Sequence, residues 1–188
     1  PLPGNGATTI ILGNCGFAAA PMSRDKAAQL EMVNIFSFFE DIPIGPFLEN
    51  VPWDWEKWSE YKASLTSKVK VPANYAIFVG HIAIRLAAMG LEAWERVATP
   101  AEIARMAELL DDALAAGALG LSDNMHDHDG NNRPIPTLVA DDAEFSALFD
   151  VLERYPAASY QVIVDTAMRK TGPQSLERLE RLLKGRRT

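Results

Sequence analysis

The sequence predicts an α/β fold with parallel strands, and three observations support this. Four apolar, strand-like runs alternate with helical segments along the 188 residues. The first run is β-branched and apolar on both faces, the pattern of a strand buried on both sides of a parallel sheet. Several runs end in polar residues. Either an open sheet or part of a (β/α)8 barrel produces this order, and we expect residues 1–188 to form a single domain of about four β/α units.

The first half of the chain is expected to hold one strand and one long helix before an irregular excursion. The strand is predicted at residues 7–12, "ATTIIL". Ser23 is the expected N-cap of a helix from Arg24 to Phe39, where apolar residues recur at helical spacing. Residues 40–70 are rich in proline and tryptophan. We expect this part to be irregular and to end in a short aromatic helix, with the tryptophans at 53, 55 and 58 lining a pocket or fastening the excursion to the core.

The second half begins with a strand run at 74–81, "NYAIFVGH". Thr99 as N-cap, Pro100 at the first helical position and Glu102 in a capping box predict a helix that Gly117 ends. The remaining elements are a strand at 118–122, a polar loop, a helix from Asp141 or Asp142 to Arg154, a strand at 159–165 and a helix at 172–183.

Composition excludes several classes of protein. The net charge is -7, which argues against sequence-independent binding of nucleic acid. No run of about 18 apolar residues is present, so we expect neither a transmembrane helix nor a membrane partner. The N-terminal residues lack the pattern of a signal peptide. Cys15 is the single cysteine, which rules out an internal disulfide and fits a reducing, cytoplasmic location.

Polar residues follow the strand runs and mark the expected site. They are Asn14 and Cys15, His81, Ser122 to His128, and Asp165. Because parallel strands place their carboxyl ends at one edge of a sheet, ligands gather there in both open sheets and barrels. We therefore expect these residues to lie near one another.

The chemistry of each candidate stays open at this level. Cys15 could be a zinc ligand, a nucleophile or a small buried residue. His81 could bind metal, donate to a substrate carbonyl or serve only the structure. Arg85 could pair with a carboxylate or pack along the start of a helix. His126 and His128 have the His-x-His spacing of many zinc sites, but they lie in a loop where alternation has no meaning, and a solvated polar loop explains them better.

Several segments together resemble one family. They are "GATTIILGNCGFAAAP", "EDIPIGPFLENVPWDWEKWSEY", "VPANYAIFVGHIAIR", "ATPAEIARMAELLDDALAAGALGLS" and "DGNNRPIPT". In this order they resemble the N-acyl-D-amino-acid deacylases (D-aminoacylases) of the amidohydrolase superfamily. The resemblance implies part of a zinc-dependent (β/α)8 barrel that hydrolyses an amide bond of a small N-acyl amino acid or related amide. It makes Cys15 a zinc ligand, and places His81 and Arg85 beside the ligands or against the substrate.

The resemblance also implies that the site is incomplete. The family's His-x-His pair lies on a strand before residue 7, and its other histidine ligands and catalytic aspartate lie beyond the matching segment. We therefore assign no catalytic residue and expect this chain alone to be inactive. The alternative is a non-catalytic module of the same fold. In either case unpaired strand edges predict a homo-oligomer, in the simplest case a dimer.

Overall fold

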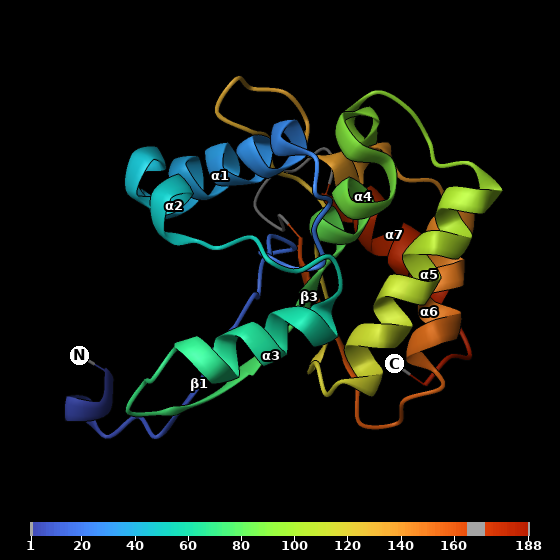
Figure 1. The fold of residues 1–188 in the computed structure, drawn as a ribbon. Helices are drawn as coiled ribbons and strands as arrows, with labels where there is room; N and C mark the ends of the chain where they lie inside the picture. Colours follow the sequence, from blue (N-terminus) through green and yellow to red (C-terminus); the bar gives the residue numbers. More distant parts are fainter. Residues whose placement is uncertain (1, 165–171, 188) are drawn as a thin grey trace.

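The strands of the protein are parallel and follow one another in sequence order, as seen in a computed structural model that describes residues 2–164 and 172–187 (Figure 1). Strand β1 (Thr9–Leu12) pairs with β2 (Asn74–Ile77), and β3 (Val79–Gly80) pairs with β4 (Gly120–Asn124), which pairs with β5 (Ser159–Ile163). Only Phe78 separates β2 from β3, and the Leu119 amide donates to the Ile77 carbonyl (2.9 Å). The order is therefore β1, β2–β3, β4, β5, which confirms the predicted α/β class with parallel strands.

The long helices begin at caps that the sequence encodes. Helix α5 (Pro100–Ala115) begins after Thr99 with the predicted capping box, and Gly117 follows it with a positive φ of 96°. Helix α6 (Asp142–Leu152) is capped by Asp141, whose side chain accepts from the Glu144 amide.

Helix α1 (Lys26–Glu40) corrects the prediction of its start. Its N-cap is Asp25, which accepts from the Ala27 amide, whereas the Ser23 hydroxyl accepts from the Asp25 amide (3.0 Å). The side chain of Ser23 therefore stabilises the turn before the helix. Both residues are good caps, and the chain uses the second of them.

The tryptophan-rich excursion contains one more helix than predicted. Helix α2 (Ile44–Asn50) precedes the expected aromatic helix α3 (Trp58–Lys68). The tryptophans at 53, 55 and 58 are buried in the main core. The Trp55 indole donates to the Ala19 carbonyl (2.8 Å), which fastens the excursion to the loop after β1.

The remaining described elements complete the β/α units. They are the 3-10 turns η1 (Leu2–Asn5), η2 (Gly90–Trp94) and η3 (Pro136–Val139) and the helices α4 (His81–Met89) and α7 (Gly172–Leu183). In Figure 1, α5, α6 and α7 lie together, and α1 and α2 lie together apart from them. None of the described helices combines the length and the apolar character that crossing a bilayer requires.

The prediction that β1 is buried on both faces is wrong. Ile11 is 53% exposed and Leu12 is 44% exposed. Within the described ranges 2–164 and 172–187, β1 pairs with a strand on one side only, so it is an edge strand. A β-branched run fits burial, but burial of both faces also needs elements packed over each of them, which the sequence of the strand does not supply.

Candidate functional site

The turn that carries Cys15 lies at the carboxyl edge of the sheet. It follows β1 and includes Gly13 and Gly16, each with a φ of 77° that favours glycine. The Gly16 amide donates to Ser122 Oγ in β4 (3.2 Å), and the Gly16 carbonyl accepts from the Ile82 amide in the first turn of α4 (3.2 Å). The structure therefore brings Cys15, His81 and Ser122 to one edge, as the positions of the strand ends predict.

The Cys15 thiol is half-buried and unpaired with another cysteine. It lines a cavity of about 280 Å³, together with apolar side chains that include Phe17, Phe36 and Trp58. Burial raises the pKa of the thiol, and a hydrogen bond from the Phe17 amide offsets only part of this effect. A raised pKa keeps the thiol protonated near neutral pH, which is the opposite of what an activated nucleophile needs.

The described residues do not by themselves surround a metal ion. Over 2–164 and 172–187, no group of three or more His, Cys, Asp or Glu side chains has a metal-binding arrangement. Zinc in proteins takes four ligands, or three and a water. Among the described residues Cys15 is therefore a single soft donor, and zinc would need further donors beside it.

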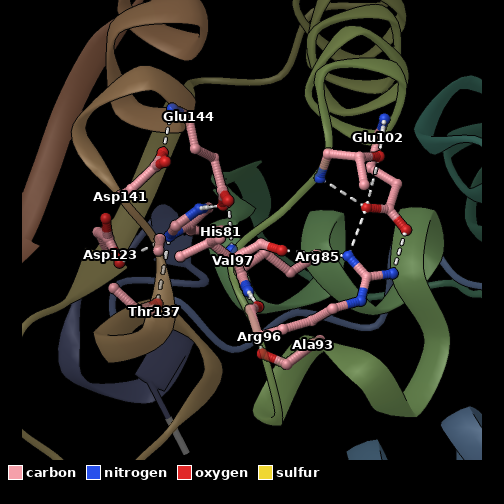
Figure 2. A network of polar contacts seen from close by, with 12 residues as sticks. His81, Arg85, Ala93, Arg96, Val97, Glu102, Asp123, Thr137, Asp141 and Glu144 are labelled. Carbon is pink, nitrogen blue, oxygen red and sulfur yellow. Dashed lines mark hydrogen bonds and ion pairs between the residues drawn. The ribbon is translucent and has the colours of Figure 1, made fainter.

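His81 lies at the start of α4, where it forms the centre of a buried polar network (Figure 2). Its Nε2 lies 2.7 Å from Glu144 Oε1, and its Nδ1 lies 3.3 Å from Asp123 Oδ1 and 3.2 Å from Thr137 Oγ1. Burial lowers the pKa of His81, but the two carboxylates outweigh it and raise the pKa to about 9. The imidazolium donates from both nitrogens, and neither is free to bind a metal.

Arg85 extends the same network one helical turn along α4. Its guanidinium forms an ion pair with Glu144 and donates to the carbonyls of Ala93 (3.0 Å) and Arg96 (3.1 Å). Like His81 it has no exposed surface. The two cations face the carboxylates of Asp123 and Glu144, so the buried charges balance.

Tyr160 completes the network from β5. Its hydroxyl donates to Asp123 Oδ2 (3.3 Å), and burial beside that carboxylate raises the pKa of the phenol far above its usual range. Sequence reasoning did not single out Glu144, Thr137 or Tyr160. The one feature of the sequence that marks Glu144 is its position in the first turn of a predicted helix. This position does not indicate its partner, because His81 is 63 residues away.

The two loop histidines lie apart from the network. His128 Nδ1 is within 2.9 Å of the Asp129 carbonyl, and His126 Nδ1 lies 3.7 Å from an oxygen of Asp127. Asp129 holds the loop, since it accepts from the Asn131 amide and from the backbone and side chain of Arg133. The remaining strand-end candidate, Asp165, lies outside the described residues.

Comparison with known proteins finds relatives along most of the chain, although no family model matches it. An uncharacterized protein of Mycobacterium tuberculosis is 32% identical over 161 residues, which cover 79% of this chain and 25% of the relative. An N-acyl-D-aspartate deacylase of Alcaligenes xylosoxydans is 34% identical over 125 residues, covering 65% of this chain and 21% of the relative. The chain thus spans about a quarter of the length of the curated relatives that it matches.

Solved structures agree with this match. An N-acyl-D-glutamate deacylase from Bordetella bronchiseptica, determined with zinc and a phosphonate mimic of the tetrahedral intermediate, is 25% identical with a TM-score of 0.71; the alignment covers 98% of this chain and 33% of that one. A D-aminoacylase structure is 28% identical with a TM-score of 0.65, over 95% of this chain and 32% of that one. Another D-aminoacylase structure was determined in a study of its binuclear metal centre.

Proposed function

On the premise that the chain is homologous to one section of the D-aminoacylases of the amidohydrolase superfamily, we propose that it forms part of a metal-dependent amidohydrolase. The proposed substrate is a small N-acyl amino acid or related amide, and the proposed cofactor is zinc. The homology confirms the resemblance seen in the sequence. Activity requires more of the parent barrel than these residues contain, so the chain alone is expected to be inactive.

The observation that carries the proposal is the place of Cys15. The thiol stands in a glycine-bounded turn at the carboxyl edge of parallel strands, within a segment homologous to metal-containing deacylases. As a soft ligand, a cysteine thiolate suits zinc, provided that it loses its proton on binding. Bound zinc would lower the pKa of a water molecule and polarise the acyl carbonyl.

We assign His81 and Arg85 to positioning rather than to contact with substrate. Both are fully buried, and every described polar contact of His81 is to a side chain of the network. Together with Glu144 they join the beginnings of α4 and α6, and His81 also contacts Asp123 in β4. A buried network of this kind fixes the edge of the sheet on which the Cys15 turn rests.

Zinc content tests the role of Cys15. Purified under reducing conditions, the wild-type chain is compared with Cys15→Ala and with the double variant His126→Ala/His128→Ala. The proposal predicts that any zinc retained by the wild type is lost in Cys15→Ala and kept in the double variant. Retention of zinc by Cys15→Ala would show that the thiol is not a ligand, and loss in the double variant would transfer the site to the loop. Zinc-free wild-type protein would confine the metal proposal to a longer parent chain.

Release of amino acid from N-acyl-D-amino acids, with the N-acyl-L-amino acids as controls, tests the chemistry. The chain of 188 residues is expected to show no turnover, and the same assay on a polypeptide extended at both ends is expected to show it. Turnover that needs Cys15 in the short chain would contradict the expected inactivity. An inactive extended polypeptide with intact structure would contradict the enzyme proposal itself.

The second candidate function is a non-catalytic module that self-associates. It is favoured by one observation, the exposed apolar side chains of Ile11 and Leu12 on edge strand β1. Light scattering of the wild type against Ile11→Lys tests it, with Leu138→Lys as a control at an exposed position in η3. A dimer that only Ile11→Lys dissociates supports the module, and a monomeric wild type argues against it.

The single cysteine remains the reason to propose a cytoplasmic location.

A further inference from the structure

The backbone N–H and C=O groups of Gly16 are both held by elements that lie far from Gly16 in the sequence. Ser122 Oγ accepts from the Gly16 amide (3.2 Å) and donates to the Val79 carbonyl (3.4 Å). On the other side, the Ile82 amide in the first turn of α4 donates to the Gly16 carbonyl (3.2 Å). First-turn amides have no partner within their own helix, so this bond satisfies one of them. The turn is therefore joined to β3, β4 and α4 at once.

Close backbone approach leaves this turn little freedom. A Cβ placed on Gly80 would lie 2.3 Å from the Gly16 carbonyl oxygen, closer than real Cβ atoms come to other atoms. A Cβ on Gly16 would lie 3.2 Å from the Asn124 amide nitrogen and 3.3 Å from Asp123 Cα. Two glycines thus let the turn rest directly on the ends of β3 and β4. Ser122 is the side chain that holds it there, and it has no exposed surface.

The position of the thiol follows from the position of Gly16. The Gly16 amide nitrogen is bonded to the carbonyl carbon of Cys15, so the two belong to one planar peptide unit. The hydrogen bond from this amide to Ser122 Oγ fixes that peptide and with it the Cα of Cys15, from which the thiol projects. A change at Ser122 is therefore transmitted to Cys15 through one peptide unit.

We infer that Ser122 is a positioning residue that holds the Cys15 sulfur at the edge of the sheet by fixing Gly16. Its functional meaning rests on the proposed role of Cys15 as a metal donor. The positioning itself concerns only the protein and can be measured without metal. No other cysteine is present, so every thiol signal reports on Cys15.

The test is the rate at which iodoacetamide alkylates Cys15 in zinc-free protein, at one pH and well below the unfolding transition. Ser122→Ala is compared with the wild type and with Tyr155→Phe, which also removes one hydroxyl but lies outside the network, since the Tyr155 hydroxyl donates to Asp111 Oδ1 (2.8 Å). We expect a rise of about fivefold in Ser122→Ala, the factor that corresponds to one hydrogen bond of about 1 kcal/mol. Tyr155→Phe is expected to react at the wild-type rate.

Equal rates in Ser122→Ala and the wild type would overturn the inference, and so would an equal rise in both variants, which would report general loosening. If Ser122→Ala does not fold, hydrogen exchange in the wild type decides instead: protected Gly16 and Ile82 amides support the inference, and rapid exchange of Gly16 overturns it. A Ser122-dependent rate in a chain that never binds zinc would keep the positioning role and confine the proposed metal role to a longer parent chain. The two failures are thus distinguishable.

Discussion

His81 Nε2 lies 2.7 Å from Glu144 Oε1, and neither side chain has any exposed surface. The pair joins the first residue of α4 to the first turn of α6. Glu144 also forms an ion pair with Arg85. Burial alone would raise the pKa of Glu144, but its contacts with His81 and Arg85 hold that pKa below its usual value. The folded state therefore favours a protonated His81 opposite an ionised Glu144.

Stability is predicted to fall as the pH rises through the range in which His81 loses its proton. The pKa of His81 is about 9 in the folded chain, against an ordinary value of 6.5. Between these values the folded state binds the proton that the unfolded state has lost, so the stabilising effect is complete below pH 6.5 and gone above pH 9. The shift corresponds to about 3 kcal/mol.

Urea unfolding between pH 6 and pH 9 measures this effect. His81→Gln should flatten the dependence of the unfolding free energy on pH, whereas His126→Gln, a change outside the network, should preserve it. The same slope in His81→Gln and the wild type would assign the pH dependence to other groups.

Arg85→Met is predicted to destabilise the chain by about 3–5 kcal/mol, because it leaves the buried carboxylate of Glu144 without its arginine. Adding Glu144→Gln to this variant should restore part of the loss, since it removes the excess charge. Arg105→Met is the control, because Arg105 forms an exposed pair with Glu108 and should cost less than about 0.5 kcal/mol. Chemical denaturation of the four proteins supplies the comparison. A double variant no more stable than Arg85→Met would contradict the charge argument.

Local rules in the sequence predict the elements and the edge of the sheet where the candidate site lies. The start of α5 depends on Thr99, Pro100 and Glu102, which are neighbours in the chain. The arrival of Cys15, His81 and Ser122 at one edge follows from the parallel order of the strands that precede or contain them. These features need no knowledge of distant contacts.

Features that depend on distant contacts escape such rules. Arginine is seldom fully buried, so the residues next to Arg85 in the sequence do not indicate that its side chain lies in the core. The partner of His81 comes from another β/α unit, and the exposure of Ile11 depends on what lies beside β1. The start of α1 is a smaller error of two residues: Asp25 caps the helix instead of the predicted Ser23, because two good capping residues lie within one turn.

Gly80→Ala is predicted to destabilise the chain by about 3 kcal/mol or more, the upper range for overpacking a buried site. Its new Cβ would meet the backbone of Gly16, which is itself held by Ser122 and Ile82 and cannot move away cheaply. Gly45→Ala is the matched control, since that Cβ would meet nothing within 4 Å in α2. It should stabilise by about 0.4–1 kcal/mol through the unfolded state. Thermal unfolding of both variants gives the answer, and similar melting temperatures would refute the close approach.

Thr99→Ala is predicted to cost about 1 kcal/mol, because the Thr99 hydroxyl accepts from the Glu102 amide at the start of α5. The Glu102 carboxylate in turn accepts a hydrogen bond from the Thr99 amide (2.7 Å), which completes the capping box. The carboxylate also accepts from Arg96, whose hydrogen bonds, with those of Thr99, lower the pKa of Glu102 to about 2. Thr66→Ala is the control, because Thr66 is exposed and its hydroxyl donates to the Lys62 carbonyl inside its own helix without capping it. Its effect should stay within about 0.5 kcal/mol. Urea unfolding at neutral pH separates the two variants. A loss in Thr99→Ala no larger than that in Thr66→Ala would mean that Glu102 and Arg96 hold the helix start without the threonine.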